Sequence, residues 1–483
     1  MESFVKDQDI QKKRWYLLLI VGLATALSSF ALNAVTIALP LMSKDYNVSG
    51  ISIAWVQTGF ILTSTCLVVV LGRVGDSFGK MRQFKLSLIV LIIGLLLGTI
   101  KGSFELLITA RVIQGIGSAM SMSVNFAIAT ELFPRHERGR ALGVIGAFLA
   151  GGGIVGPAFS GIILQNWGYH AIFLVGVPIA ILTAVLAFIW LPKDRLLSGK
   201  GIDYTGSALF AAVIVCFFFG VNTVQTVGLF TVESLLLIAF FVVCLVLFTV
   251  LEKRASNPLI KFSLIKEHSM LIYLLTLFLI YSTSAFNAFI MPFYLLQALH
   301  ISPGLAALMT VTLSLAITIV SPMAGRLTDK YGAKNMILSG TAIVAASQLA
   351  YIFYGLETNT LILILTFVVT GIGSGIFQVP NNAMIMSQVP KEQLGLASSL
   401  AVLTRNLALT SGSLFASVIL FTAMSALSGH HIVSYLPGNP ALFIAGMHTV
   451  YFVTFALCAL AFVLVLIDKL RSVRKVACGE QVE

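Results

Sequence analysis

Fourteen long apolar runs divide this sequence, and each is close to the ~20 residues that a helix needs to cross a bilayer. The runs are continuous rather than alternating, which excludes a transmembrane barrel. With 58% hydrophobic and 10% charged residues, the chain also has too little polar surface for a soluble protein. We therefore predict an all-α integral membrane protein with 14 transmembrane helices. The expected spans are 15–40, 51–72, 84–100, 104–128, 141–165, 170–192, 204–222, 231–252, 268–292, 303–324, 335–355, 360–384, 397–424 and 441–468.

The Lys and Arg residues alternate with these spans. With the N-terminus in the cytoplasm, all of them lie in cytoplasmic segments except Lys44, Lys101, Arg111 and Arg405. This asymmetry predicts a multi-pass protein of the cell membrane with both termini cytoplasmic. The net charge of +11 is then a topology signal rather than a nucleic-acid surface.

The chain contains an internal repeat. "GRVGDSFGK" from Gly72 returns as "GRLTDKYGAK" from Gly325, 253 residues later, and "GIGSAMSMSVN" returns as "GIGSGIFQVPN" at an offset of 256. An even number of spans separates the copies, so the two halves keep one orientation, as in a large class of secondary transporters. The expected organisation is a leader (1–14), a six-helix bundle (15–192), two inserted helices (204–252), a like-oriented six-helix bundle (268–468) and a cytoplasmic tail (469–483).

The repeated loop motif combines glycines, which permit tight turns, with an acid that can accept backbone N–H groups at a helix start. We expect the motif to form a contact that holds one state of a protein with rocking halves shut. The alternative is an ordinary basic loop that only sets membrane topology, which would contain similar residues. The candidate latch residues are Gly72, Asp76 and Gly79 in the first copy and Gly325, Asp329 and Gly332 in the second.

Arg111 lies inside the fourth span, where an arginine costs about 2.5–3.5 kcal/mol by insertion scales. It must face a cavity, water or a partner, and Gln114 shares its helix face. Glu105 is expected near the outer surface. A structural arginine held by backbone carbonyls is the alternative. The equivalent position in the second half is Phe367, so the charge belongs to one half only.

The fifth span contains "GGGIVGPAFSG". A dinucleotide-binding loop is rejected, because no strand precedes it and the motif lies inside an apolar span. Small residues spaced by four predict close helix packing, and Pro157 favours a kink. With Ala408 and Ser413 at equivalent positions, we expect no second copy. The packing candidates are Gly152, Gly156, Pro157 and Gly161.

Polar residues inside other spans are candidates to line a central substrate cavity, although interhelical hydrogen bonds are an equally good explanation for each. They are Asn33, Gln57, Gln114, Asn125, Tyr281, Asn287, Gln378, Asn382 and Arg405.

Nearly the whole chain resembles the major facilitator superfamily, and within it the fourteen-span drug:proton antiporter branch. "GRVGDSFGK" is similar to the loop signature, and "RVIQGIGSA" to the span-four signature whose arginine, here Arg111, is linked to proton coupling. "GGGIVGPAFSG" is similar to the signature associated with exporters. The branch commonly has an acid where this chain has Ala31, so the proton-coupling candidates are Asp76, Glu105 and Arg111.

The resemblance implies a monomeric multidrug exporter that moves amphipathic small molecules outward by alternating access, with exchange for protons as the first hypothesis. Its partners are the substrate, protons and the bilayer, and the proton motive force replaces any cofactor. Exporters or facilitators of an endogenous lipid or metabolite, without proton coupling, are the alternative, and a receptor or sensor is a weaker one. No enzyme motif and no metal site are expected; His430 and His431 are expected in a solvated outer loop.

Overall fold

The computed structural model describes residues 7–48, 50–194, 203–228, 231–254, 268–390, 393–429 and 439–477. Within these residues the chain is helical, and fourteen helices are long and apolar enough to cross a membrane. The predicted fold class and the predicted number of spans are therefore confirmed. His430 and His431 lie outside the described residues.

The first half consists of six long helices and one short one. They are α1 (Gln8–Asn33), α2 (Leu39–Asp45), α3 (Gly50–Phe78), α4 (Lys80–Thr99), α5 (Phe104–Leu132), α6 (Arg138–Trp167) and α7 (His170–Trp190). The helix α1 begins inside the segment expected as a leader, because Asp7 caps it by accepting hydrogen bonds from the backbone N–H groups of Asp9 and Ile10.

An inserted pair of helices follows, and then the second half. The pair is α8 (Tyr204–Val227) and α9 (Val232–Arg254). The second half contains α11 (His268–Pro292), α12 (Pro303–Tyr331), α13 (Ala333–Ile352), α14 (Thr360–Ser387), α15 (Leu394–Ser428) and α16 (Pro440–Ala477). A π-helical turn at Phe293–Ala298 extends α11 beyond the expected end of its span.

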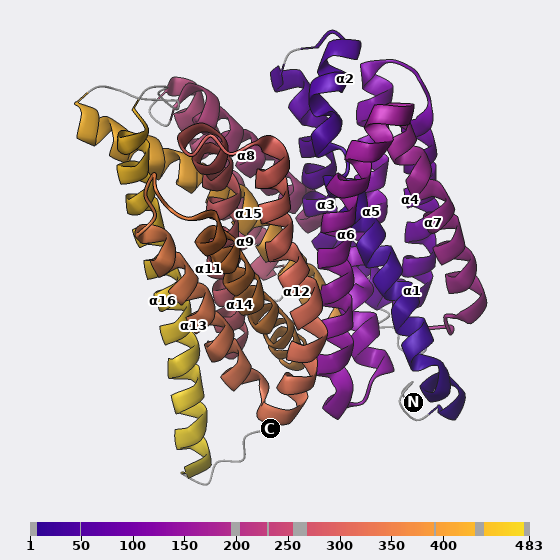
Figure 1. Cartoon of the computed structure of the whole chain (residues 1–483). Helices are drawn as coiled ribbons and strands as arrows, with labels where there is room; N and C mark the ends of the chain where they lie inside the picture. The colour runs from indigo at the N-terminus through magenta and orange to yellow at the C-terminus, as the bar shows by residue number, and fades with distance from the viewer. Residues whose placement is uncertain are drawn as a thin grey trace.

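The two halves stand side by side, and both chain ends lie at the lower end of the molecule in Figure 1. We call this end the terminal face and the other end the opposite face. The halves meet where α3 packs against α15 and α6 packs against α12. The inserted helix α8 contacts both α3 and α15, so it lies beside the seam between the halves.

The first span differs from the continuous helix expected over 15–40. The helix α1 ends at Asn33, a short 3₁₀ turn covers Thr36–Ala38, and α2 begins at Leu39. Two local features oppose a continuous helix. The side chain of Asn33 donates to the carbonyl of Ser29 at 2.8 Å, and Pro40 has no N–H to donate to the carbonyl of Thr36. The break leaves the last carbonyls of α1 in need of donors.

Candidate functional site

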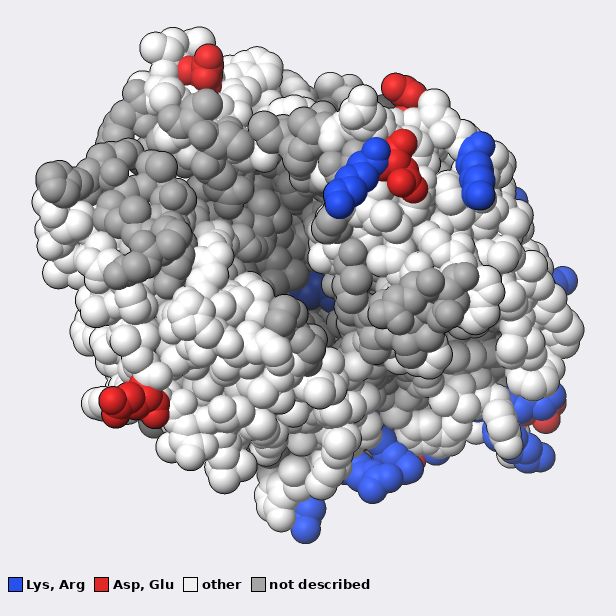
Figure 2. Space-filling model, turned by 45° about the horizontal axis from the view of Figure 1, so that its top comes forward, with Lys and Arg blue, Asp and Glu red and all other residues white. Residues whose placement is uncertain are grey.

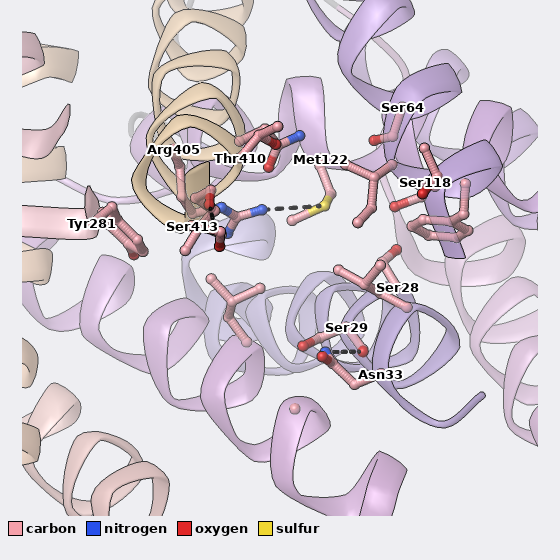
Figure 3. Close-up of a pocket in the computed structure, with 18 of the residues that line it drawn as sticks. Ser28, Ser29, Asn33, Ser64, Ser118, Met122, Tyr281, Arg405, Thr410 and Ser413 are labelled. Atoms are coloured by element: carbon pink, nitrogen blue, oxygen red, sulfur yellow. Dashed lines mark hydrogen bonds between the residues drawn. The ribbon is translucent and has the colours of Figure 1, made fainter. Parts of the chain in front are cut away.

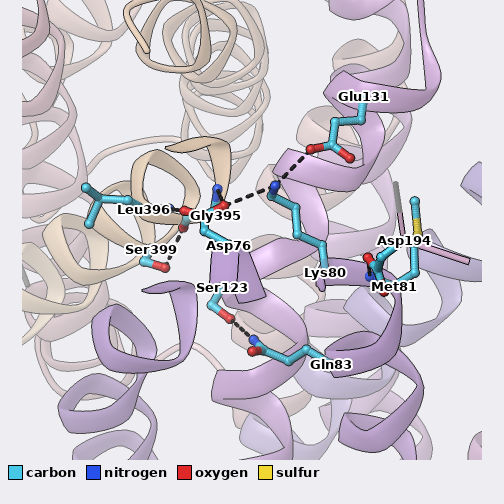
Figure 4. A network of polar contacts seen from close by, with 10 residues as sticks. All are labelled: Asp76, Lys80, Met81, Gln83, Ser123, Glu131, Asp194, Gly395, Leu396 and Ser399. Atoms are coloured by element: carbon cyan, nitrogen blue, oxygen red, sulfur yellow. Dashed lines mark hydrogen bonds and ion pairs between the residues drawn. The ribbon is translucent and has the colours of Figure 1, made fainter. Parts of the chain in front are cut away.

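Asp76 joins the two halves at the terminal face. It lies near the end of α3, is 2% exposed, and accepts hydrogen bonds at 3.0 Å from the backbone N–H groups of Gly395 and Leu396. These groups open α15 in the other half, so the carboxylate caps that helix where its dipole is positive. Figure 4 shows this contact beside the ion pair to Lys80.

The second copy of the motif makes the same contact in the reverse direction. Asp329, near the end of α12, accepts from the backbone N–H groups of Gly139 (3.0 Å) and Arg140 (3.1 Å), which open α6. Each half therefore caps a helix of the other. Unlike Asp76, Asp329 is solvent-exposed. We call these two contacts the crossed latches.

Glycines let the helices touch at both latches. A Cβ atom added to Gly72 would collide with Ser399 and the carbonyl of Gly395, and one added to Gly325 would collide with the backbone of Gly139. Small residues permit this backbone approach between membrane helices. The terminal face is thus closed at two equivalent points.

The other two glycines of the repeated motif turn the chain. Gly79 has φ +113° between α3 and α4, and Gly332 has φ +85° between α12 and α13. L-residues rarely adopt this conformation, so both turns require glycine. Each turn directly follows the helix that carries the motif aspartate.

Two acids outside the predicted site residues support the first latch. Lys80 lies between Asp76 (3.0 Å) and Glu131 at the end of α5 (2.9 Å), and all three side chains are buried. Asp194 caps α4 by accepting from the backbone N–H groups of Met81 (2.8 Å) and Arg82 (3.0 Å). In the sequence, each of these two acids lies just beyond the end of an expected span, and that position could have marked both as candidates.

Arg111 is fully buried between three helices. Its Nη1 donates to the carbonyl of Ala31 (2.8 Å) and to Gln114 Oε1 (2.6 Å), and its Nε donates to the carbonyl of Val56 (2.7 Å). The Ala31 carbonyl belongs to the last turn of α1, so Arg111 supplies a donor at the break in that span. None of the ion pairs between described residues involves Arg111. The guanidinium thus bonds the backbone carbonyl of Ala31, the residue that stands where the fourteen-span branch commonly has an acid.

The glycines of the fifth span pack α6 against α1. Gly152 lies against the backbone of Ala26, and Gly156 lies against Phe30 and Ala34. Pro157 and Gly161 lie within the same helix.

The expectation of no second copy is wrong in part. At the repeat offset, Gly412 stands at the position of Gly156 and packs closely against Ser282 and Ala285 of α11. Ala408 and Ser413 stand at the positions of Gly152 and Pro157 and differ from them, so the motif as a whole does not reveal the match at Gly412. A close approach to the first helix of each half is therefore common to both bundles.

A cavity of about 650 Å³ lies between the halves, above the latches. Figure 2 shows the hollow from the opposite face, with a basic side chain visible inside it. Its volume is within the range of small-molecule sites. Hydroxyl, amide and apolar groups line it together, from both halves and from α8. The polar lining residues are Ser28, Ser29, Asn33, Thr58, Ser64, Ser118, Asn222, Tyr281, Ser314, Gln378, Arg405, Asn406, Thr410 and Ser413.

Some of the predicted cavity residues meet there and others do not. Figure 3 shows Asn33 facing Tyr281 and Arg405 across the space. Gln378 also lines it, and Asn382 borders a small adjoining void. The side chains of Gln57, Gln114, Asn125 and Asn287 are not part of the lining.

Several of these outlying residues have local roles instead. Asn125 is buried and donates to Thr25 at 2.7 Å, which ties α5 to α1. Gln114 donates to the carbonyl of Gly94 at 2.8 Å and accepts from Arg111. Glu105 is exposed at the start of α5. None of the three proton-coupling candidates lines the cavity.

A duplicated bundle of membrane helices with a cavity open toward one face and crossed contacts at the other has the architecture of a secondary transporter. The chain belongs to the Major Facilitator Superfamily, whose sequence model matches residues 21–262 and 272–477. It is a transporter rather than an enzyme, and the predicted superfamily is confirmed.

Curated relatives resemble almost the full length of the chain. The riboflavin transporter RibZ of Clostridioides difficile is 28% identical over 84% of this chain and 88% of its own. The multidrug resistance protein Stp of Mycobacterium tuberculosis is 25% identical over 88% of this chain and 79% of its own. Among solved structures, the human organic anion transporter MFSD10 is similar in fold, with a TM-score of 0.67 and 14% identity over 93% of this chain and 98% of that one.

Proposed function

We propose that this protein exports amphipathic small molecules from the cell by alternating access, in exchange for protons. The observation that carries the proposal is the crossed latches beneath a cavity that opens at the opposite face. The Lys and Arg asymmetry supports a cytoplasmic terminal face, so a protein in this state would release substrate outward. A relative named a multidrug resistance protein supports the substrate class.

Transport requires both latches to open together as the halves rock. Each latch joins a motif aspartate of one half to a helix start of the other, so neither half can rotate without breaking both contacts. Opening would expose the cavity to the cytoplasm and close it to the outside. The membrane potential can bias this cycle, because one charge moved across 100 mV corresponds to about 2.3 kcal/mol.

For the proton site, the proposal is the buried group of Asp76, Lys80 and Glu131. Two carboxylates share one ammonium there, and Arg73 on the same helix also interacts electrostatically with Asp76, so the group holds two acids away from bulk water beside two cations. When the first latch opens, Asp76 loses its two backbone donors, which favours uptake of a proton by that group. Glu105 is exposed and Arg111 has carbonyl partners, so neither fits this task as well.

A second candidate is an exporter or facilitator of an endogenous metabolite that moves without protons. A relative named a riboflavin transporter favours it. The two candidates share a cavity and a rocking motion, and they differ in the substrate class and in whether substrate movement carries protons.

The discriminating experiment uses purified protein in proteoliposomes that contain a pH-sensitive dye. Antiport predicts that adding a transported compound to one side moves protons in the opposite direction, and that Glu131→Gln weakens this proton movement. Active transport that ignores the pH gradient would exclude the exchange and favour the second candidate.

A further inference from the structure

The charge inside the cavity is unbalanced. Among the described residues that line it, Arg405 is the only charged side chain, and the remainder are hydroxyl, amide, thioether and apolar groups. The buried acids Asp76 and Glu131 do not line the cavity and pair with Lys80 at the terminal face. A positive charge therefore faces the substrate space without a carboxylate beside it.

The contacts of Arg405 differ from those of Arg111. Arg111 makes three hydrogen bonds of 2.6–2.8 Å to oxygen atoms, and its Nη2 has no hydrogen-bond partner among the described residues. Arg405 donates from Nη2 to Met122 Sδ at 3.9 Å, and its Nε has no hydrogen-bond partner among the described residues. Its guanidinium also donates a hydrogen bond to the hydroxyl of Tyr281. A guanidinium with unfilled donors in a partly desolvated site favours an anionic ligand, since it can donate two parallel hydrogen bonds.

The repeat shows that this charge is one-sided. The helices α6 and α15 begin 256 residues apart, at Arg138 and Leu394. At that offset, Leu149 is equivalent to Arg405, and both residues line the cavity. One wall thus presents a cation where the facing wall presents an apolar side chain, so a bound molecule with one charged end would have a preferred orientation.

We propose that the substrate is a small amphipathic molecule with one anionic group, which binds Arg405 and Tyr281. This inference rests on the proposed transport function and specifies its substrate class. The uncharged part of the molecule lies toward Leu149, where hydroxyl and amide groups such as Ser29 and Asn33 bind its polar atoms. A cation is disfavoured, because it would meet Arg405 without a compensating acid in the lining.

The test uses one aromatic scaffold in three charge states. The probes are 7-methoxycoumarin derivatives carrying a carboxylate, its methyl ester or an aminomethyl group, and their binding is measured by fluorescence with full-length protein in nanodiscs. Wild type is expected to bind the carboxylate at least about tenfold more tightly than the other two. Arg405→Gln should weaken carboxylate binding about 30-fold or more and leave ester binding nearly unchanged.

Three further variants separate charge from structure. Arg405→Lys should retain the preference for the carboxylate in part. Lys101→Gln removes an exposed cation on the opposite face and should change nothing. Leu149→Arg in an Arg405→Leu background should restore the preference, because it returns the charge to the cavity from the other wall.

The same probes, followed in transport, separate failure of the inference from failure of the function. Transport of the ester or the amine as well as the carboxylate, with no effect of Arg405→Gln on selectivity, would overturn the anion inference and leave the transport function standing. Transport of none of the three probes by wild type, with monodisperse protein, would count against the inference and the proposed function together. Loss of carboxylate binding alone in Arg405→Gln would support the inference.

Discussion

The crossed latches differ in burial, and this difference predicts unequal effects of the same substitution. Asp76 is 2% exposed and is also paired with Lys80, whereas Asp329 is exposed. Asn is close in shape to Asp but carries no charge and has only one acceptor oxygen. Asp76→Asn therefore leaves one of the two backbone N–H groups of α15 facing an amide donor, and it deprives Lys80 of one of its two carboxylates.

The magnitude follows from the bonds lost. A hydrogen bond to a charged group in a buried site contributes about 1.5–3 kcal/mol, so Asp76→Asn should destabilise the closed terminal face by about 2–4 kcal/mol. At 1.36 kcal/mol per factor of ten, this is about 30- to 900-fold. An equilibrium of about 99:1 would become about 3:1 to 1:9. Asp329→Asn, at an exposed helix start, should cost under about 1 kcal/mol, or about fivefold.

The assay is a distance distribution between spin labels on the terminal face, one at Arg82 on α4 and one at Lys330 on α12. Both side chains are exposed and belong to different halves. A second, longer distance should appear strongly in Asp76→Asn and only weakly in Asp329→Asn. Equal effects of the two substitutions, or a single unchanged distance in both, would refute the reasoning from burial.

Individual contacts lead to three more predictions. Arg111→Ala should lower the stability of the first half by about 2–5 kcal/mol, because two buried carbonyls and Gln114 lose their donor; thermal melting in detergent measures this, and a melting temperature equal to wild type would contradict it. Gly395→Val should open the terminal face and reduce transport without unfolding the protein, because its Cβ would collide with Asp76 and the carbonyl of Gly72; vesicle transport together with size-exclusion profiles checks both parts. Glu131→Gln should leave substrate binding intact and make transport less dependent on the pH gradient in proteoliposomes.

Much of the fold is predictable, because duplication leaves its trace in the sequence. The fixed offset pairs Asp76 with Asp329 from the sequence alone, and the apolar runs identify the fourteen spans. The partner of each aspartate is not predictable in this way. Nothing local in either motif specifies that it caps a helix of the opposite half, since that choice depends on how the bundles dock.

The break in the first span escapes prediction for a different reason. Hydropathy stays high from Trp15 to Pro40, and it does not report whether a single backbone bond is made. The carbonyl partners of Arg111 depend on that break. The hypothesis of a structural arginine therefore predicts that backbone carbonyls accept its hydrogen bonds, but it does not predict which residues supply them. Likewise, Asn222 joins the cavity lining only because α8 packs beside α3.

The cavity is predictable only in part. Asn33, Tyr281, Gln378 and Arg405 line it, whereas Gln114 and other polar residues of the spans bond to neighbouring helices. A polar residue inside a span must find a partner, but the sequence does not show whether that partner is substrate, water or protein. Tertiary packing sets the direction in which such a side chain points.

In this structure the cavity opens to one face while the crossed latches close the other, and we propose that the protein alternates between this state and its reverse. A single cysteine in place of Ser314, in a background without the native cysteines, reports this directly when treated with a membrane-impermeant thiol reagent in oriented vesicles. We predict labelling from the face opposite the termini in otherwise wild-type protein, and added labelling from the terminal face in Asp76→Asn. Equal labelling from both faces in the protein with intact latches, or none from the terminal face after the latch is broken, would contradict closure of the terminal face by the crossed latches.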